Sequence, residues 1–246
     1  MYYRLIDMKI PLLKTIIVAV SVFGIADSPA ATILFTDSLP TLDIIRSNTT
    51  VSASGNLQVR NIGATPTANT RWVGFGFSTS SSVSLDKVTF FIYNDIVSSG
   101  ALGATMTISV VSLASLTASP STPYTPLYSE TATVPATYGN ENYMTFDLNS
   151  SFSLTAAGNY GVMVYFNSNA SNRGINFTQS PTNSGGIGGV GDLFYTSDLG
   201  ATYTNTTAPL NFVLQTVPEP STTLLALLGG TFIIGANRSR KRHAKA

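Results

Sequence analysis

The chain has 246 residues, a formal net charge of +1 and only 10% charged residues, so it is long enough for one domain with a sizeable core. It contains no cysteine, and its one histidine, His243, lies close to the carboxyl end. These absences exclude disulfides, a Ser-His-Asp triad, a Cys-His pair and a histidine-ligated metal site in the rest of the chain. Five basic and nine acidic residues between residues 31 and 217 give a net charge of minus four, which argues against a nucleic-acid partner.

The first segment, residues 1–30, has the pattern of a secretory signal peptide. Lys9 and Lys14 precede an apolar stretch over residues 15–26, and a small-residue exit follows. About twelve apolar residues fall short of the roughly twenty that span a bilayer, which favours a cleaved signal over an anchor. We expect cleavage after Ala30, with Ala26 as the alternative position.

The body of the chain, residues 31–216, is expected to be one extracytoplasmic all-β domain. Its apolar runs are rich in β-branched and aromatic residues, are bounded by Ser, Asn, Gly and Pro, and show no helical periodicity. Such a series of short strands predicts an antiparallel β-sandwich of jelly-roll type. The expected strands cover residues 71–77, 83–93, 104–113, 143–148, 160–166, 175–177, 193–195 and 210–216.

Two stretches of the body are expected to pair one strand with the next. Residues 70–94 contain two apolar runs joined by a Ser-rich turn, and residues 143–166 repeat this layout around Gly158 and Asn159. Over residues 68–217 the layout resembles the choice-of-anchor β-sandwich domains, especially type R. The resemblance implies an extracytoplasmic domain of unknown activity, and no site residues transfer from it.

One short motif of the body matches the spacing of an Asp-box. It consists of Thr196, Asp198, Gly200, Thr202 and Tyr203. Asp198 can accept backbone N–H bonds inside a hairpin, Gly200 can supply a positive φ, and Tyr203 can pack the turn onto the sheet. Asp-boxes of sialidases are structural and repeated, and this chain has one, so we expect a structural turn and no part in glycoside cleavage.

The carboxylates of the body do not predict an active site. A glycosidase needs two carboxyl groups roughly 5 to 10 Å apart, and Glu130, Glu141 and Asp147 are eligible only by residue type. Asp192 and Asp198 flank a Gly-rich region that could offer oxygen ligands to calcium, but no D-x-D-x-D-G loop is present. We therefore expect no catalytic residues, metal or cofactor, and a polysaccharide-acting glycoside hydrolase is the alternative function.

Aromatic side chains offer a different hypothesis, the binding of sugar. They could present flat faces to sugar rings while Asn and Ser side chains bond the hydroxyl groups. Packing within the sandwich is the alternative, and we favour packing for Trp72 because it begins a strongly apolar strand. The candidates are Trp72, Tyr93, Tyr124, Tyr128, Tyr138 and Tyr143.

The last thirty residues, 217–246, form a terminal signal in three parts. Pro218, Glu219 and Pro220 precede an apolar run over residues 222–236. As an α-helix this run would rise about 22 Å, a short span for a hydrocarbon core of ~30 Å. The basic cluster that follows argues against a buried core helix and, by the positive-inside rule, places the body outside the membrane. It contains Arg238, Arg240, Lys241 and Arg242.

These three parts resemble a PEP-CTERM sorting signal, which occurs on exported proteins of Gram-negative bacteria that make exopolysaccharide. The resemblance implies that a membrane-embedded exosortase recognises Pro218, Glu219 and Pro220 and cuts nearby, removing the helix. The protein would face the periplasm from the inner membrane transiently and then reach the cell surface or the biofilm matrix. We expect a structural or adhesive role there, with exopolysaccharide as a candidate partner.

Overall fold

The computed structural model describes part of the chain, residues 31–49, 55–61, 70–155, 157–167, 173–180 and 189–217, with only the backbone at residues 95 and 96. The chain divides into units 1–30 and 31–246, and every described residue belongs to the second unit. The expected signal peptide and the terminal signal from Pro218 onward lie outside the described residues. In the part that is described, no helix has the length and apolarity needed to cross a membrane.

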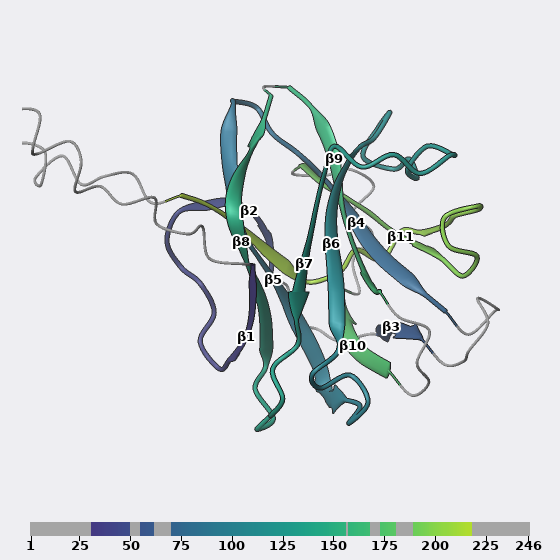
Figure 1. Cartoon of the computed structure of the whole chain (residues 1–246). Helices are drawn as coiled ribbons and strands as arrows, with labels where there is room; N and C mark the ends of the chain where they lie inside the picture. Colours follow the sequence, from purple (N-terminus) through teal and green to yellow (C-terminus); the bar gives the residue numbers. More distant parts are fainter. Residues whose placement is uncertain are drawn as a thin grey trace, which may run out of the picture. The chain divides into compact units, whose positions relative to one another are not determined.

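The described residues form two antiparallel sheets of seven and six strands (Figure 1). The expected all-β antiparallel sandwich is confirmed, whereas jelly-roll connectivity stays a prediction. The first sheet contains β1 (Thr32–Thr36), β2 (Ile44–Asn48), β3 (Gly55–Asn61), β5 (Val83–Val97), β8 (Tyr143–Leu154), β10 (Arg173–Gln179) and β13 (Phe212–Thr216). The second sheet contains β4 (Trp72–Ser78), β6 (Thr105–Ser112), β7 (Tyr128–Thr133), β9 (Asn159–Phe166), β11 (Val190–Thr196) and β12 (Thr204–Thr206).

The first sheet is organised around β5, a strand of 15 residues. Along one edge its first part pairs with β8. Residues 85–90 also pair with β13, and Ile92 and Val97 pair with β10 further along. β1 extends the sheet beyond β8, β3 extends it beyond β10, and β2 pairs with β13. One long strand therefore supports three neighbours.

The core lies between the two sheets and is rich in phenylalanine. Phe75 of β4 stacks on Phe212 of β13 with ring centroids 3.9 Å apart, and it meets Phe90 of β5 edge-on at 5.8 Å. Because alternate residues of a strand share a face, every second residue of β4 points into this layer. Burying each such side chain stabilises the fold by about 1.5–3 kcal/mol. The fully buried rings are Phe75, Phe77, Phe90, Phe146, Phe177, Phe194 and Phe212, of which Phe194 lies outside this main core.

The two expected strand pairings, within 70–94 and within 143–166, are wrong. β4 pairs with β9 and β11 while β5 pairs with β8, β10 and β13, so β4 and β5 lie in different sheets, and β8 and β9 are likewise divided. The turns after β4 and β8 carry the chain from one sheet to the other, because the strands bury apolar sides that face each other across the core. The two crossings bond each other: Thr79 donates its N–H to Gly158 O at 3.2 Å and its hydroxyl to Thr155 O at 3.1 Å.

Candidate functional site

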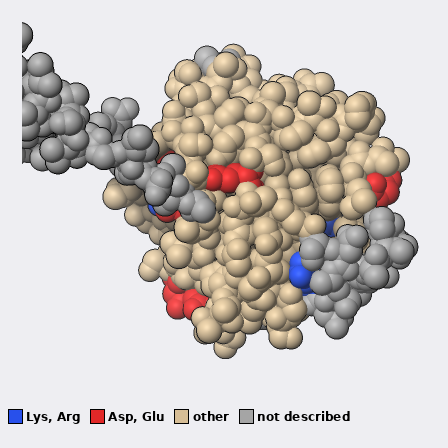
Figure 2. Space-filling model, viewed as in Figure 1, with Lys and Arg blue, Asp and Glu red and all other residues tan. Residues whose placement is uncertain are grey.

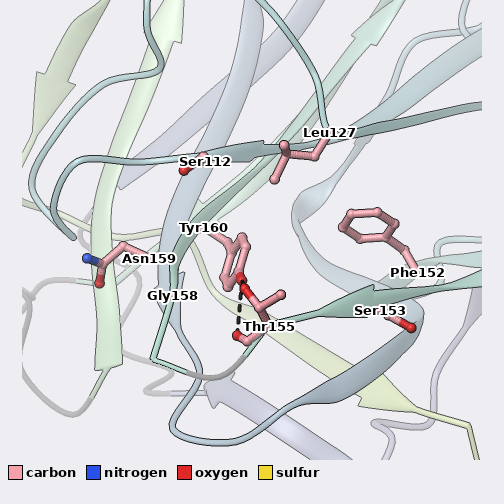
Figure 3. A pocket seen from close by; sticks show the side chains of 8 residues that line it. All are labelled: Ser112, Leu127, Phe152, Ser153, Thr155, Gly158, Asn159 and Tyr160. Atoms are coloured by element: carbon pink, nitrogen blue, oxygen red, sulfur yellow. Dashed lines mark hydrogen bonds between the residues drawn. The ribbon is translucent and has the colours of Figure 1, made fainter.

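A pocket of about 400 Å³ opens beside the crossing between β8 and β9 (Figure 3). This volume lies within the roughly 300–1,000 Å³ typical of small-molecule sites. None of the lining side chains carries a formal charge at neutral pH, so the pocket suits a neutral ligand. The lining residues are Ser112, Leu127, Phe152, Ser153, Thr155, Gly158, Asn159 and Tyr160.

Tyr160 is held rigidly on one side of the pocket. Its hydroxyl lies 2.6 Å from Thr155 Oγ1 and donates to Thr155 O at 3.0 Å (Figure 3). A Cβ atom at Gly158 would lie 2.4 Å from the Tyr160 ring, so this crossing requires glycine there. With only 5% of its surface exposed, Tyr160 is a fixed wall and not a free stacking platform.

An apolar surface of the pocket is formed by Phe152 and Leu127. Phe152 of β8 stacks on Tyr128 of β7 with centroids 5.2 Å apart, and Leu127 is 51% exposed. The Tyr128 hydroxyl donates to the Glu130 carboxylate. Burial, and secondly this hydrogen bond, raise the pKa of Tyr128 to about 12, which keeps the phenol neutral. The pocket therefore combines an apolar surface with hydroxyl and amide groups.

The three carboxylates considered for glycoside hydrolysis are used in structural contacts. Glu130 accepts the backbone N–H of Asn149 at 3.0 and 3.2 Å, which ties β7 of the second sheet to β8 of the first. Asp147 pairs with Lys87 at 2.5 Å, and Glu141 accepts a backbone N–H at 2.7 Å from two residues before it. None of the three lines the pocket.

The Asp-box-like motif forms the turn between β11 and β12. Asp198 Oδ1 accepts the Thr202 N–H at 2.9 Å and the Thr196 hydroxyl at 2.5 Å, and Oδ2 accepts the Thr202 hydroxyl at 2.5 Å. These bonds, led by the one from Thr196, lower the pKa of Asp198 to about 2. Gly200 has a φ of +89° and donates its N–H to Thr196 Oγ1 at 3.1 Å. Both carboxylate oxygens thus accept hydrogen bonds within the turn itself.

Tyr203 leads from this turn into an outer aromatic cluster, which we define as Trp72, Tyr124, Tyr165, Phe194 and Tyr203. Trp72 stacks on Tyr165 with centroids 4.1 Å apart and meets Tyr124 edge-on at 5.5 Å. Tyr203 meets Phe194 edge-on at 6.4 Å. The structure therefore brings together two of the six sugar-binding candidates, Trp72 and Tyr124, and packs both into protein.

The remaining aromatic candidates with ring contacts lie apart from this cluster. Tyr138 meets Phe35 at 5.0 Å, and Tyr143 meets Phe91 at 4.9 Å. Tyr128 reaches the pocket only through Phe152. The aromatic residues that do line the pocket, Phe152 and Tyr160, were not predicted from sequence. The Gly-Asn-Tyr sequence before β9 fits a hairpin within one sheet as well as a crossing between sheets, so it did not mark the pocket.

Charged groups are sparse on the face of the molecule that Figure 2 shows. Figure 2 shows a face that is uncharged over most of its area, with separate acidic and basic patches. Among the residues that are described, no group of three or more His, Asp or Glu is placed to hold a metal ion. Asp192 is buried in β11, and residues 181–188 of the Gly-rich region before it are outside the described ranges.

Comparison with protein-family models finds the PEP-CTERM protein-sorting motif at residues 216–241. The match begins at the last residue of β13, so the sandwich runs directly into the motif. The motif indicates an exported protein that exosortase sorts, made as a membrane-anchored precursor and processed to the cell surface. Pro218, Glu219 and Pro220 fall inside the match.

The other comparison adds no relative. No curated protein matches the chain. The resemblance of the body to the choice-of-anchor domains therefore stays a prediction. Arg238, Arg240 and Lys241 fall inside the sorting-motif match, Arg242 lies one residue beyond it, and all four are outside the described residues.

Proposed function

We propose that this protein is a structural or adhesive component of the cell surface or biofilm matrix, without catalytic activity, whose pocket beside the sheet crossings binds neutral sugar units of an exopolysaccharide. The observation that carries the proposal is the pocket lining, in which an apolar surface lies beside hydroxyl and amide groups. The sorting motif supports the cell-surface location, because it indicates an exported protein.

The chemistry of a neutral sugar matches this lining. A pyranose ring has C–H faces that pack on apolar side chains and a rim of hydroxyls that need donors and acceptors. Leu127 and Phe152 offer the first, and Ser153 and Asn159 offer the second. The bond between Tyr160 and Thr155 fixes one wall before the ligand arrives, which reduces the entropic cost of binding.

Binding without turnover is supported by the positions of the carboxylates. Hydrolysis requires two carboxyl groups flanking the scissile bond. Glu130, Glu141 and Asp147 each accept hydrogen bonds or an ion pair from the fold, and none lines the pocket. We also propose that the body is a choice-of-anchor domain with jelly-roll connectivity. Residues 222–236 would form a helix that holds the precursor transiently in the inner membrane.

A binding assay tests the sugar hypothesis on the mature protein purified from the cell surface. We expect it to be retained on neutral exopolysaccharide, and the Leu127→Ser, Phe152→Ala variant to bind about tenfold more weakly, a difference of 1.4 kcal/mol. The matched control is Leu34→Ser, which changes a similarly exposed leucine on β1. Release of new reducing ends from the polysaccharide would instead assign a hydrolase.

Mass spectrometry of the mature termini tests the sorting hypothesis separately. The expected carboxyl end lies near Pro218–Pro220. Recovery of the full tail through Ala246 in the surface form, in cells with an active exosortase, would contradict processing at the motif and leave the sugar hypothesis standing.

A further inference from the structure

Three exposed apolar side chains gather where the chain leaves the sandwich. They are Leu42, Ile44 and Val217, with 72%, 43% and 42% of their surface exposed, and we call them the exit patch. Single exposed leucines are common on protein surfaces, but adjacent ones indicate a contact surface. The other three large apolar side chains found exposed among the described residues, Leu34, Leu127 and Leu199, are on β1, before β7 and in the β11–β12 turn.

Backbone pairing holds the members of the exit patch together. Ile44 of β2 is in register with Gln215 of β13, and the Gln215 side-chain amide donates to Leu42 O at 3.1 Å. Thr216 donates its N–H to the carbonyl of the residue after Leu42 at 2.8 Å. Val217 follows directly, so all three residues lie around the end of one strand.

Chain length places this end of the sandwich near the membrane in the anchored precursor. The apolar run begins at Thr222, five residues after Val217. Five residues extend at most about 18 Å. The headgroup region on each side of the hydrocarbon core is about 5–8 Å thick, so the exit patch is within reach of the lipid surface.

We propose that the exit patch is a membrane-contact surface: in the anchored precursor, Leu42, Ile44 and Val217 insert into the lipid headgroup boundary and orient the sandwich above the bilayer. Interfacial insertion of apolar side chains is shallow, about 5–10 Å, which lets the exposed carboxylate of Asp43 remain among the headgroups. The contact would hold the sorting motif at a fixed height above the membrane that contains exosortase. This inference rests on insertion of the tail, and does not depend on sugar binding.

Fluorescence of the full chain in liposomes of phosphatidylethanolamine and phosphatidylglycerol tests the proposal. Because the chain has no cysteine, one introduced cysteine can be labelled with an environment-sensitive dye. We expect lipids spin-labelled near the headgroup to quench a label at Leu42→Cys several-fold. The matched controls, Leu34→Cys and Leu199→Cys, should not be quenched. A label at Ala226→Cys, inside the apolar run, reports insertion of the tail.

Each outcome is decisive. Quenching at Ala226→Cys without quenching at Leu42→Cys overturns the membrane contact alone, and no quenching at either position overturns tail insertion as well. Quenching or protection at Leu42→Cys only when exosortase is added to the bilayer assigns the patch to a protein partner and overturns the lipid contact. In cells, Leu42→Ser with Ile44→Ser should slow tail removal several-fold, whereas Leu34→Ser with Leu199→Ser should not.

Discussion

The outer faces of the two sheets are built in opposite ways. On the second sheet, the Phe194 ring packs directly over two glycines. A Cβ atom at Gly74 would lie 2.3 Å from Phe194 Cε2, and one at Gly161 would lie 2.7 Å from Phe194 Cζ. The first sheet carries small polar pairs across β5 and β8, where the hydroxyls of Thr89 and Thr145 are 2.8 Å apart. One face relies on packing of large side chains and the other on short polar contacts.

The packed face also needs a cover. The connection between β6 and β7 lies against it, because Leu116 O accepts the Asp192 N–H of β11 at 2.9 Å and Tyr124 packs on Trp72. The Phe194 ring covers the glycines on the outer face of the second sheet, and the β6–β7 connection in turn covers this aromatic layer. Of the two outer faces, the one on the second sheet should therefore contribute more to stability, and substitutions can test this.

The largest expected effect is that of Phe194→Ala. It removes a fully buried ring and should destabilise the protein by about 3–5 kcal/mol. Thr89→Ala, at an equally buried site of the first sheet, removes one hydroxyl pair and should cost about 1 kcal/mol. Urea denaturation followed by the fluorescence of Trp72, the single tryptophan, measures both. Equal losses would contradict the proposed difference between the faces.

A smaller loss is expected for Gly74→Ala. The added methyl group meets Phe194 and also Val162 O at 2.4 Å, and overpacking of this kind costs about 1–3 kcal/mol. The control is Gly55→Ala, whose Cβ would meet the end of the flexible Gln179 side chain at 2.9 Å. The same denaturation assay compares them. A Gly74→Ala protein as stable as the control would show that Phe194 can move away from the sheet.

The Asp198 turn should contribute about 1 kcal/mol at neutral pH, the typical value of its hydrogen bonds. The pKa of Asp198 is lowered from 3.8 to about 2 on folding, so the contribution is complete above pH 3.8 and is lost as the pH falls through 2. Asp198→Ala should therefore be less stable than wild type at pH 7, and the difference should shrink as the pH approaches 2 and disappear below it. Thr202→Val, which keeps the backbone bond, should lose less. A pH-independent difference would contradict this.

The smallest effect is expected for Lys87→Met on the first sheet. Lys87 and Asp147 are each about one third exposed, and such pairs contribute about 0.2–1 kcal/mol. The difference from wild type should shrink as salt is added, because ions screen the pair. Denaturation at low and high salt measures it. A loss larger than that of Gly74→Ala would reverse the comparison.

The strands that sequence predicted and those it missed differ by position in the sheets. Every expected run became a strand, and β5 and β8 extend beyond their expected ends. The missed strands each pair with a single neighbour, at a sheet edge. An edge strand is solvated along one side and lacks a strong apolar pattern. These strands are β1, β2, β3, β7 and β12.

The same distinction separates the two sites. The Asp198 turn could be anticipated because its bonds all join residues within four positions of one another. The pocket could not, because it joins the end of β6, the end of β8 and the start of β9. Its position follows from the turn at residues 155–158 crossing between sheets, where the spacing had favoured a hairpin within one sheet. No local signal distinguishes the two.

The position of β13 has a consequence for biogenesis. This strand pairs with β5 on one side and β2 on the other, yet it ends at Thr216, where the sorting motif begins. A chain exported from its amino end cannot complete the first sheet until its last residues emerge, so folding finishes while the precursor is still tethered. A cut at Pro218–Pro220 would leave every strand that the structure describes in place. Release would therefore leave the stability of the domain intact. The anchored and the free protein would have the same fold and would differ only in the time at which each is present.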